Sequence, residues 1–419
     1  MATNDKSIPP AKPTDGETVF GDNVRATSAL GSLAVKAGAV GVISLGISAA
    51  LGMSQGDGFR RFTLSYLTAF MWGLAICLGA IYWVTLQHLV NAKWSTVLRR
   101  VGEVLANTAP VFGVLALPIV VPIFLGNSSV YVWADHAKVE ADHLLHHKAG
   151  YLNSGFFLVR YVLYFGFWTL LARFYLRKSL EQDKSSAPEG IRKRLQAAAG
   201  PGMIVYALAV TFFSIDLVMS VDPYWFSTIF GVYYFASCVL CINSTAALSA
   251  MWLQNNGALK KSVTTEHFHD LGKMMFAFTI FWAYTGFAQF MLIWYANIPE
   301  ETAWYKERFA HGWGDLSIAL LVLHFIVPFF GLLSRHVKRN RKALAFWAFW
   351  ILGVVYLDMY WLIMPATHSE DVPFGLIDIT TLAGIAGVLI GAAAFLAKNL
   401  TLVPVKDPRL AHSVAFENI

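Results

Sequence analysis

The chain has 419 residues, of which 56% are hydrophobic and only 14% are charged, and its mean hydropathy is +0.53. Soluble domains carry about 25% charged residues, so this composition excludes a soluble globular protein and favours a polytopic helical membrane protein. The net charge of +6 does not indicate nucleic-acid binding, because the lysines and arginines gather beside apolar segments, where membrane topology accounts for them.

The first 30 residues are polar and rich in proline and glycine, and they lack the basic start and apolar core of a signal peptide. We therefore expect an N-terminal tail over residues 1–30, one helical transmembrane domain over 31–400, and a C-terminal tail over 401–419. The domain is expected to be all-α, because a chain in lipid must satisfy its backbone hydrogen bonds internally.

Ten apolar segments are long enough to cross a membrane as helices. Proline at positions 110 and 118 predicts kinks in the third, because proline lacks the backbone N–H that a helix needs. The predicted spans are 37–53, 62–88, 104–125, 155–175, 203–220, 226–253, 271–296, 316–333, 343–364 and 376–397.

Lysine and arginine are concentrated in alternate connections, which predicts that these connections and both termini are cytoplasmic. The opposite connections hold only Arg60, Arg61, Lys138, Lys148, Lys306 and Arg308. The predicted cytoplasmic connections contain Arg99, Arg100, Lys178, Lys184, Arg192, Lys193, Arg194, Lys260, Lys261, Arg335, Lys338, Arg339, Arg341 and Lys342.

The outer connection over 127–153 is rich in histidine and acidic residues. His143 and His147 are four residues apart and share one face of a helix, so a metal site is one interpretation. A solvated interface helix, or a contact surface for a partner, is the interpretation that we favour.

The segment over 213–231 places Asp216 inside an apolar run, shortly before Asp222 and Pro223 break the helix. A carboxylate at that depth is costly in lipid, so Asp216 should face protein or water, toward the outer side of the membrane. Tyr224 and Trp225 are suited to the interface.

Three cysteines, at 77, 238 and 241, are too few for an iron–sulfur cluster or a disulfide framework. Cys238 and Cys241 have CxxC spacing, but Ile242 follows instead of the histidine that haem attachment requires. Only His324 lies in the middle of a span, so the sequence predicts no haem and no metal site within the membrane.

Several other ionisable and polar residues also lie within spans, where such groups often form proton pathways. Each can instead be a satisfied polar contact between helices, and Arg160 can be the counter-charge of a nearby acid. The candidates for an inner and an outer half-pathway are Arg160, Asp216, Asp270, Lys273, Tyr284, Gln289, His324, Tyr356 and Asp358.

The last span carries Ala383, Gly387 and Gly391 at four-residue spacing, which lets helices approach closely. Packing inside the chain and contact with another subunit are both compatible with this pattern.

Four stretches resemble the ActF subunits of alternative complex III, which belong to the NrfD and polysulfide-reductase type of membrane subunit. They are DPYWFSTIFGVYYFA (222–236), HDLGKMMFAFTIFWAYTGFAQFMLIWYANIPEET (269–302), HFIVPFFGLLSR (324–335) and LDMYWLIMP (357–365). The resemblance implies two four-helix bundles with two further helices, in the cytoplasmic membrane of a bacterium.

The resemblance also implies a role in a quinol:electron-acceptor oxidoreductase. Quinol is the substrate of such a complex, and its iron–sulfur clusters and c-type haems belong to partner subunits. The implied partners are an ActC-like integral subunit, an iron–sulfur subunit, c-type cytochrome subunits and lipids. This chain would hold no cofactor, would anchor the redox subunits and would provide a proton path.

Three alternatives remain open at this stage. One keeps the fold but gives this chain its own quinol site. The second is a proton-coupled secondary transporter, which predicts inverted repeats with broken helices near the midplane. The third is a purely structural anchor, for which replacing Asp216 and Asp358 by Asn would change neither turnover nor proton pumping.

Overall fold

The computed structural model describes residues 18–57 and 59–418, and these form an almost entirely helical protein. Ten helices in these ranges are long and apolar enough to cross a membrane, as predicted. They are α1 (Thr27–Ser54), α2 (Arg60–Leu89), α3 (Thr96–Ala106) with α4 (Ala109–Leu115) and α5 (Leu117–Phe124), α8 (Ser154–Lys184), α9 (Pro188–Leu217), α10 (Phe230–Asn255), α11 (Thr265–Ala296), α13 (His311–Leu320) with η3 (Leu321–Ile326) and α14 (Val327–Leu333), α16 (Arg341–Ile363), and α17 (Leu376–Ala397).

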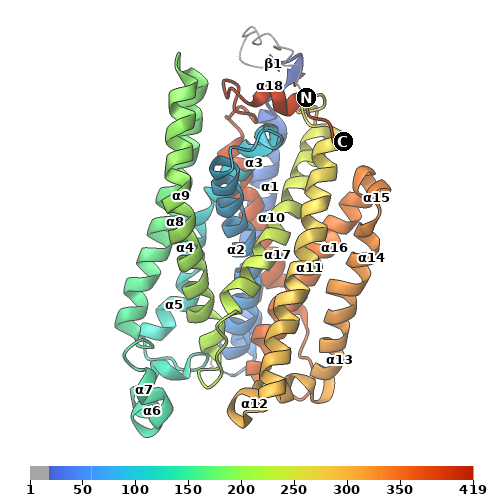
Figure 1. Cartoon of the computed structure of the whole chain (residues 1–419). Helices are drawn as coiled ribbons and strands as arrows, with labels where there is room; N and C mark the ends of the chain where they lie inside the picture. The colour runs from blue at the N-terminus through green and yellow to red at the C-terminus, as the bar shows by residue number, and fades with distance from the viewer. Residues whose placement is uncertain (1–17, 58, 419) are drawn as a thin grey trace.

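The remaining elements are short and lie at the two ends of the long helices (Figure 1). They are β1 (Thr18–Val19), β2 (Asp22–Asn23), η1 (Val132–Ala134), α6 (His136–Ala141), α7 (His143–Lys148), η2 (Met219–Val221), α12 (Pro299–Phe309), α15 (Arg335–Arg339), η4 (Met364–Thr367) and α18 (Leu410–Val414).

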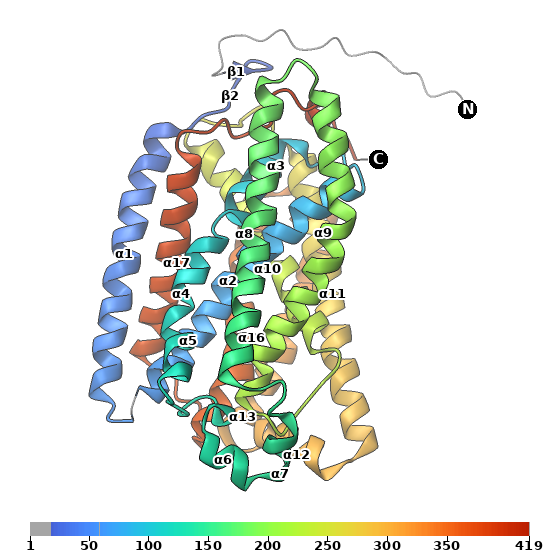
Figure 2. The same ribbon diagram turned by 90° about the vertical axis from the view of Figure 1, so that its left-hand side faces the viewer.

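The long helices form two bundles whose centre is the contact between α2 and α10. The first bundle contains α2, the α3–α5 span, α8 and α9, and the second contains α10, α11, the α13–α14 span and α16. Helix α17 packs on α2, and α1 packs on α17 at the edge of the molecule (Figure 2). The predicted all-α fold, with two four-helix bundles and two further helices, is confirmed.

The third span is divided into α3, α4 and α5, as its prolines predict. Pro110 lies in the first turn of α4 and Pro118 in the first turn of α5, where a missing N–H costs least. Asn107 lies in the break between α3 and α4, and its Nδ2 donates to the carbonyl of Ala172 in α8 at 2.9 Å.

Helices α1 and α17 approach so closely that their contact requires glycine. A Cβ atom on Gly387 would lie 2.6 Å from the Cα of Gly41, and one on Gly391 would lie 2.9 Å from the Cα of Gly38. The small residues of the last span therefore serve packing inside the chain. Gly384, rather than Ala383, completes the stripe, because it lies against Leu45 of α1.

The two ends of the bundles differ, and we name them by their contents. The terminal face carries β1, β2, α15, α18 and residues 401–418, whereas the loop face carries α6, α7 and α12 (Figure 1). On the terminal face, Asp22 accepts hydrogen bonds from the backbone of Lys260, Lys261 and Ser262, and Leu402 donates to the carbonyl of Val24. Residues 1–17 and 419 of the expected tails lie outside the described residues.

Candidate functional site

Asp358 of α16 is completely buried inside the second bundle. Its Oδ1 accepts a hydrogen bond from the hydroxyl of Tyr233 in α10, and its Oδ2 accepts one from Nε1 of Trp282 in α11 at 3.1 Å. Among the described residues, Asp358 forms no ion pair. The carboxyl group is thus buried with neutral donors only, an arrangement that makes its charged form costly in lipid.

His324 lies on the indole ring of Trp282, with ring centroids 3.7 Å apart and an angle of 24° between the planes. It is fully buried, and neither ring nitrogen has a hydrogen-bond partner within residues 18–57 and 59–418. A buried polar group without a partner is rare and often marks a functional position. We name Tyr233, Trp282, His324 and Asp358 the Asp358 cluster, to which each helix of the second bundle contributes one residue.

The backbone around His324 is unusual because η3 is a π-helix. Pro328 accounts for this locally, since it has no N–H to donate to the carbonyl of His324 one turn earlier. Nε1 of Trp350 donates to the neighbouring carbonyl of Leu323 at 2.8 Å. Single π-turns inside α-helices are frequent at functional sites.

Gln289 extends the polar region from the cluster toward the loop face. It lies about two turns beyond Trp282 on α11. Its Oε1 accepts from Oγ of Ser227 at 2.7 Å, and its Nε2 donates to the hydroxyl of Tyr305 in α12 at 3.1 Å. These groups form a chain of hydrogen bonds from Ser227 through Gln289 to Tyr305, on the side of the cluster that is nearer the loop face.

Asp270 and Lys273 lie at the opposite end of α11, on the terminal face. They form an ion pair, and Nζ of Lys273 also donates to Oδ1 of Asn418 at 2.8 Å. Asp270 precedes Trp282 by 12 residues, which corresponds to about 18 Å of helix. The ion pair is therefore separate from the Asp358 cluster.

Two other predicted residues face away from the cluster. The side chain of Tyr284 is 65% exposed on the lateral surface of α11. The hydroxyl of Tyr356 donates to the backbone carbonyl of Asp378 in α17 at 3.3 Å, on the side of α16 away from Asp358. Neither residue joins the buried carboxyl to a further proton-exchanging group.

Asp216 lies in the first bundle and is engaged by an arginine. Nε of Arg160 donates to its Oδ2 at 2.8 Å and Nη2 to its Oδ1 at 3.1 Å, while the hydroxyl of Tyr164 donates to Oδ2 at 2.9 Å. Nη1 of Arg160 donates to the carbonyl of Tyr151, whose ring covers the guanidinium at 3.9 Å. Arg160 is thus the counter-charge of Asp216, one of the two interpretations of the sequence, and the two hydrogen bonds fix the relative orientation of the two side chains.

A second buried ion pair was missed by sequence reasoning. Arg61 of α2 pairs with the fully buried Asp378 of α17, and Oγ of Ser65 donates to Asp378 Oδ1 at 2.6 Å. Asp378 also accepts from the backbone N–H of Gly375 at 2.9 Å, which caps the start of α17. The signal was an acidic residue in the third helical position, where it caps a helix.

The terminal face contains a buried ionic network that joins the first bundle to the C-terminal segment. Sequence reasoning treated Arg99 and Arg100 as loop residues, although Glu103 follows them at the three- and four-residue spacings of a helical ion pair. The network holds three cations and three carboxylates, so its charges balance. Its members are Arg99, Arg100, Glu103, Asp183, Asp407 and Arg409.

Asp407, like its partner Arg409, lies outside the transmembrane helices. Burial alone would raise its pKa, but the charge of Arg99 and the hydrogen bonds and charge of Arg409 outweigh burial, so the pKa of Asp407 is lowered. The carboxylate is therefore ionised throughout the physiological range.

Arg308 of α12 is also buried, although the sequence indicates only a loop cation. Its guanidinium lies 3.4 Å from the ring centre of Trp304, which in turn stacks on Trp225 at 4.2 Å. Trp225 is therefore part of a buried aromatic stack and does not present the half-exposed ring that the sequence predicts. Burial lowers the pKa of Arg308 to about 9, so the side chain is protonated at neutral pH.

The histidine-rich connection forms α6 and α7 on the loop face. Asp135 and Asp142 cap the two helices, and Oδ2 of Asp142 accepts from the hydroxyl of Tyr224, a bond that lowers the pKa of Asp142. No cluster of three metal-ligating side chains occurs in the described part of the chain. His143 and His147 are accordingly surface residues of a capped helix, and the metal interpretation has no further support.

Comparisons with known proteins do not assign a family to this chain. No family model matches it, and neither does any curated protein.

Proposed function

We propose that this chain is an integral membrane subunit of a bacterial quinol:electron-acceptor oxidoreductase of the alternative complex III type. In this proposal the chain anchors the redox subunits, and its Asp358 cluster exchanges protons within the second bundle. The observation that carries the proton role is the burial of Asp358 with two neutral donors and, in the described part of the chain, no cation.

The chemistry of the cluster suits reversible protonation. The hydroxyl of Tyr233 and the indole N–H of Trp282 stabilise a carboxylate at Asp358, whereas burial opposes the charge. A group with opposed influences of this kind can change its protonation state at modest cost. Asp216 has a different environment, because the guanidinium of Arg160 lies 2.8 Å from its carboxylate.

The stretches that resemble ActF subunits lie on the helices that form the Asp358 cluster. Residues 222–236, 269–302, 324–335 and 357–365 carry that resemblance, and each contributes one member of the cluster: Tyr233, Trp282, His324 and Asp358 in turn. Residues from four separated stretches thus meet at one place in the second bundle.

The proposed orientation follows the bias of lysine and arginine, which puts the terminal face in the cytoplasm of the bacterial cell. The loop face, with α6, α7 and α12, then meets iron–sulfur and c-type cytochrome subunits outside the membrane. An ActC-like integral subunit is the proposed lateral partner. In this assignment the haem c and iron–sulfur clusters belong to those partners.

A secondary transporter is less well supported. Its inverted repeats would interrupt helices at corresponding positions of the two halves. Here the helix is interrupted in the second span of the first bundle, at α3–α5, and in the third span of the second bundle, at η3. These two positions do not correspond. A quinol site within this chain is the remaining alternative, and a bound quinone that contacts α10 or α11 would favour it.

The test is a purification of the tagged chain in mild detergent from its native membrane, followed by an absorption spectrum and a quinone extraction. We expect c-type haem and iron–sulfur subunits to co-purify with quinol oxidation activity. A chain that elutes alone, colourless and monodisperse, would contradict the complex assignment and favour a transporter.

A further inference from the structure

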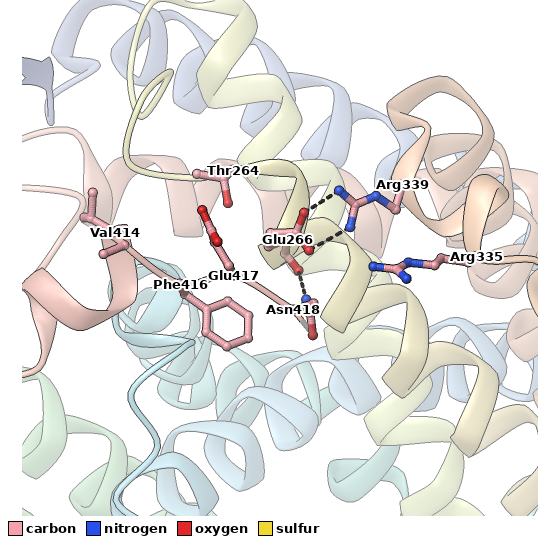
Figure 3. Close-up of a pocket in the computed structure, with 9 residues that line it drawn as sticks. Thr264, Glu266, Arg335, Arg339, Val414, Phe416, Glu417 and Asn418 are labelled. Carbon is pink, nitrogen blue, oxygen red and sulfur yellow. Dashed lines mark hydrogen bonds and ion pairs between the residues drawn. The ribbon is translucent and has the colours of Figure 1, made fainter. Parts of the chain in front are cut away.

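A polar pocket lies on the terminal face, apart from every residue of the proposed proton site. It has a volume of about 310 Å³ and opens between the start of α11, the short helix α15 and the C-terminal segment. Its walls are formed by Thr264, Glu266, Arg335, Arg339 and residues 414–418. Figure 3 shows Arg335 and Arg339 on one side and Glu417 on the opposite side.

The charged residues of the pocket differ in whether they have partners. Arg339 is satisfied, because it forms an ion pair with Glu266, whose backbone carbonyl also accepts from Asn418. In the described part of the chain, Arg335 and Glu417 form no ion pair and no side-chain hydrogen bond. The pocket therefore presents one free cation and one free carboxylate at opposite ends.

The pocket adjoins an exposed apolar surface on the side of the helices. Helix α15 follows directly after α14, whose last turns expose Phe330 and Leu333 by 68% and 55% on the lateral surface. Acyl chains can lie on these two side chains while the headgroup reaches Arg335. Basic pockets between transmembrane helices bind the anionic head groups of cardiolipin and phosphoinositides. This pocket differs from them, because its two arginines are balanced by two glutamates.

We infer that this pocket binds the headgroup of a zwitterionic aminophospholipid, with its phosphate on Arg335 and its ammonium group on Glu417. An anionic headgroup would bring a second negative charge beside Glu417 and leave that carboxylate without a partner. A zwitterion instead pairs both free charges, and phosphatidylethanolamine has this chemistry.

The experiment uses the delipidated full chain in detergent. Phosphatidylethanolamine and phosphatidylglycerol with identical acyl chains are added separately, and inorganic phosphate serves as the soluble anion. Bound lipid is counted by native mass spectrometry, and the midpoint of thermal unfolding is recorded in parallel. The variants are Arg335→Ala and Glu417→Gln, with Lys342→Ala as a control, because Lys342 is an exposed cation of the same face that does not line the pocket.

We expect the wild-type chain to retain phosphatidylethanolamine in preference to phosphatidylglycerol. Arg335→Ala should weaken that binding about tenfold or more, since a charge-assisted hydrogen bond is lost. Glu417→Gln, in an exposed segment where folding is not at risk, should remove the preference between the two lipids, and Lys342→Ala should change neither. Equal retention of both lipids by the wild type, unchanged binding in both pocket variants, or full thermal protection by inorganic phosphate would each overturn the inference.

Discussion

Arg160 and Asp216 join α8 to α9 through two charge-assisted hydrogen bonds, of 2.8 and 3.1 Å. Both side chains are buried, and Tyr164 and Tyr151 complete their surroundings. Asp358 has no such cation among residues 18–57 and 59–418. Asp216 and Asp358 look equivalent in the sequence, but only Asp216 has a cationic partner among the described residues. We therefore expect a structural role for Asp216.

Removing one member of the Arg160–Asp216 pair should destabilise the protein. We expect Arg160→Gln or Asp216→Asn to lower the free energy of unfolding by about 3–5 kcal/mol, because each leaves a buried charge unpaired. The double variant should lose less than the sum of the two. Thermal unfolding of all four forms in detergent measures this coupling, and additive losses would contradict the pairing.

His324 should matter for proton exchange but not for stability. Its ring nitrogens have no described partner, so His324→Phe keeps the stacking on Trp282 and should change the free energy of unfolding by less than about 1 kcal/mol. We expect slower hydrogen–deuterium exchange at the Asp358 carboxyl in this variant, measured by infrared spectroscopy. An unchanged exchange rate would remove His324 from the site.

Asp407 should make the C-terminal segment sensitive to acid. Its folded-state pKa lies below the ordinary value of 3.8, so the stabilisation that it provides is complete above pH 3.8 and is lost as the pH falls through the folded-state pKa. Limited proteolysis of residues 401–418 with an acid-active protease between pH 1 and pH 5 tests this sensitivity, because the loss is confined to the range below pH 3.8. Asp407→Asn should be cleaved at every pH in that range, whereas protection equal to the wild type would contradict the network.

The packing of α1 on α17 should depend on Gly387. Leucine at this position would push apart two backbones that are in direct contact, so Gly387→Leu should lower the free energy of unfolding by about 1–3 kcal/mol or more. Gly353→Ala is the matched control, because a Cβ there meets no atom within 4 Å. Equal unfolding midpoints for the two variants would show that the glycine contact is unimportant.

The fold was largely predictable from the sequence because apolar segments in lipid have few structural solutions. The ten spans follow from their length, the breaks in the third from Pro110 and Pro118, and the break after η2 from Pro223. The start of α1 was placed ten residues too late, at 37 instead of 27, because its first turns hold small and polar residues whose hydropathy is low.

The site was less predictable, since residues far apart in sequence must meet to form it. Asp358, His324 and Gln289 were identified by their position within spans, but nothing in the sequence indicates that Trp282 lies between the first two. Arg61 and Arg99 were assigned to connections because the positive-inside rule counts lysine and arginine near the ends of spans without regard to their partners. Their ion pairs are formed with Asp378 and Asp407, which lie more than 300 residues away.

The most direct test of the central claim is infrared spectroscopy of the purified chain, in which the carboxyl stretching band of a protonated side chain is followed as the pH is raised. Wild-type protein should show a buried carboxyl band that disappears reversibly with increasing pH, and Asp358→Asn should lack this band while keeping the same unfolding midpoint. A band that is unchanged in Asp358→Asn, or one that does not respond to pH, would contradict the role of Asp358 as the proton-exchanging acid.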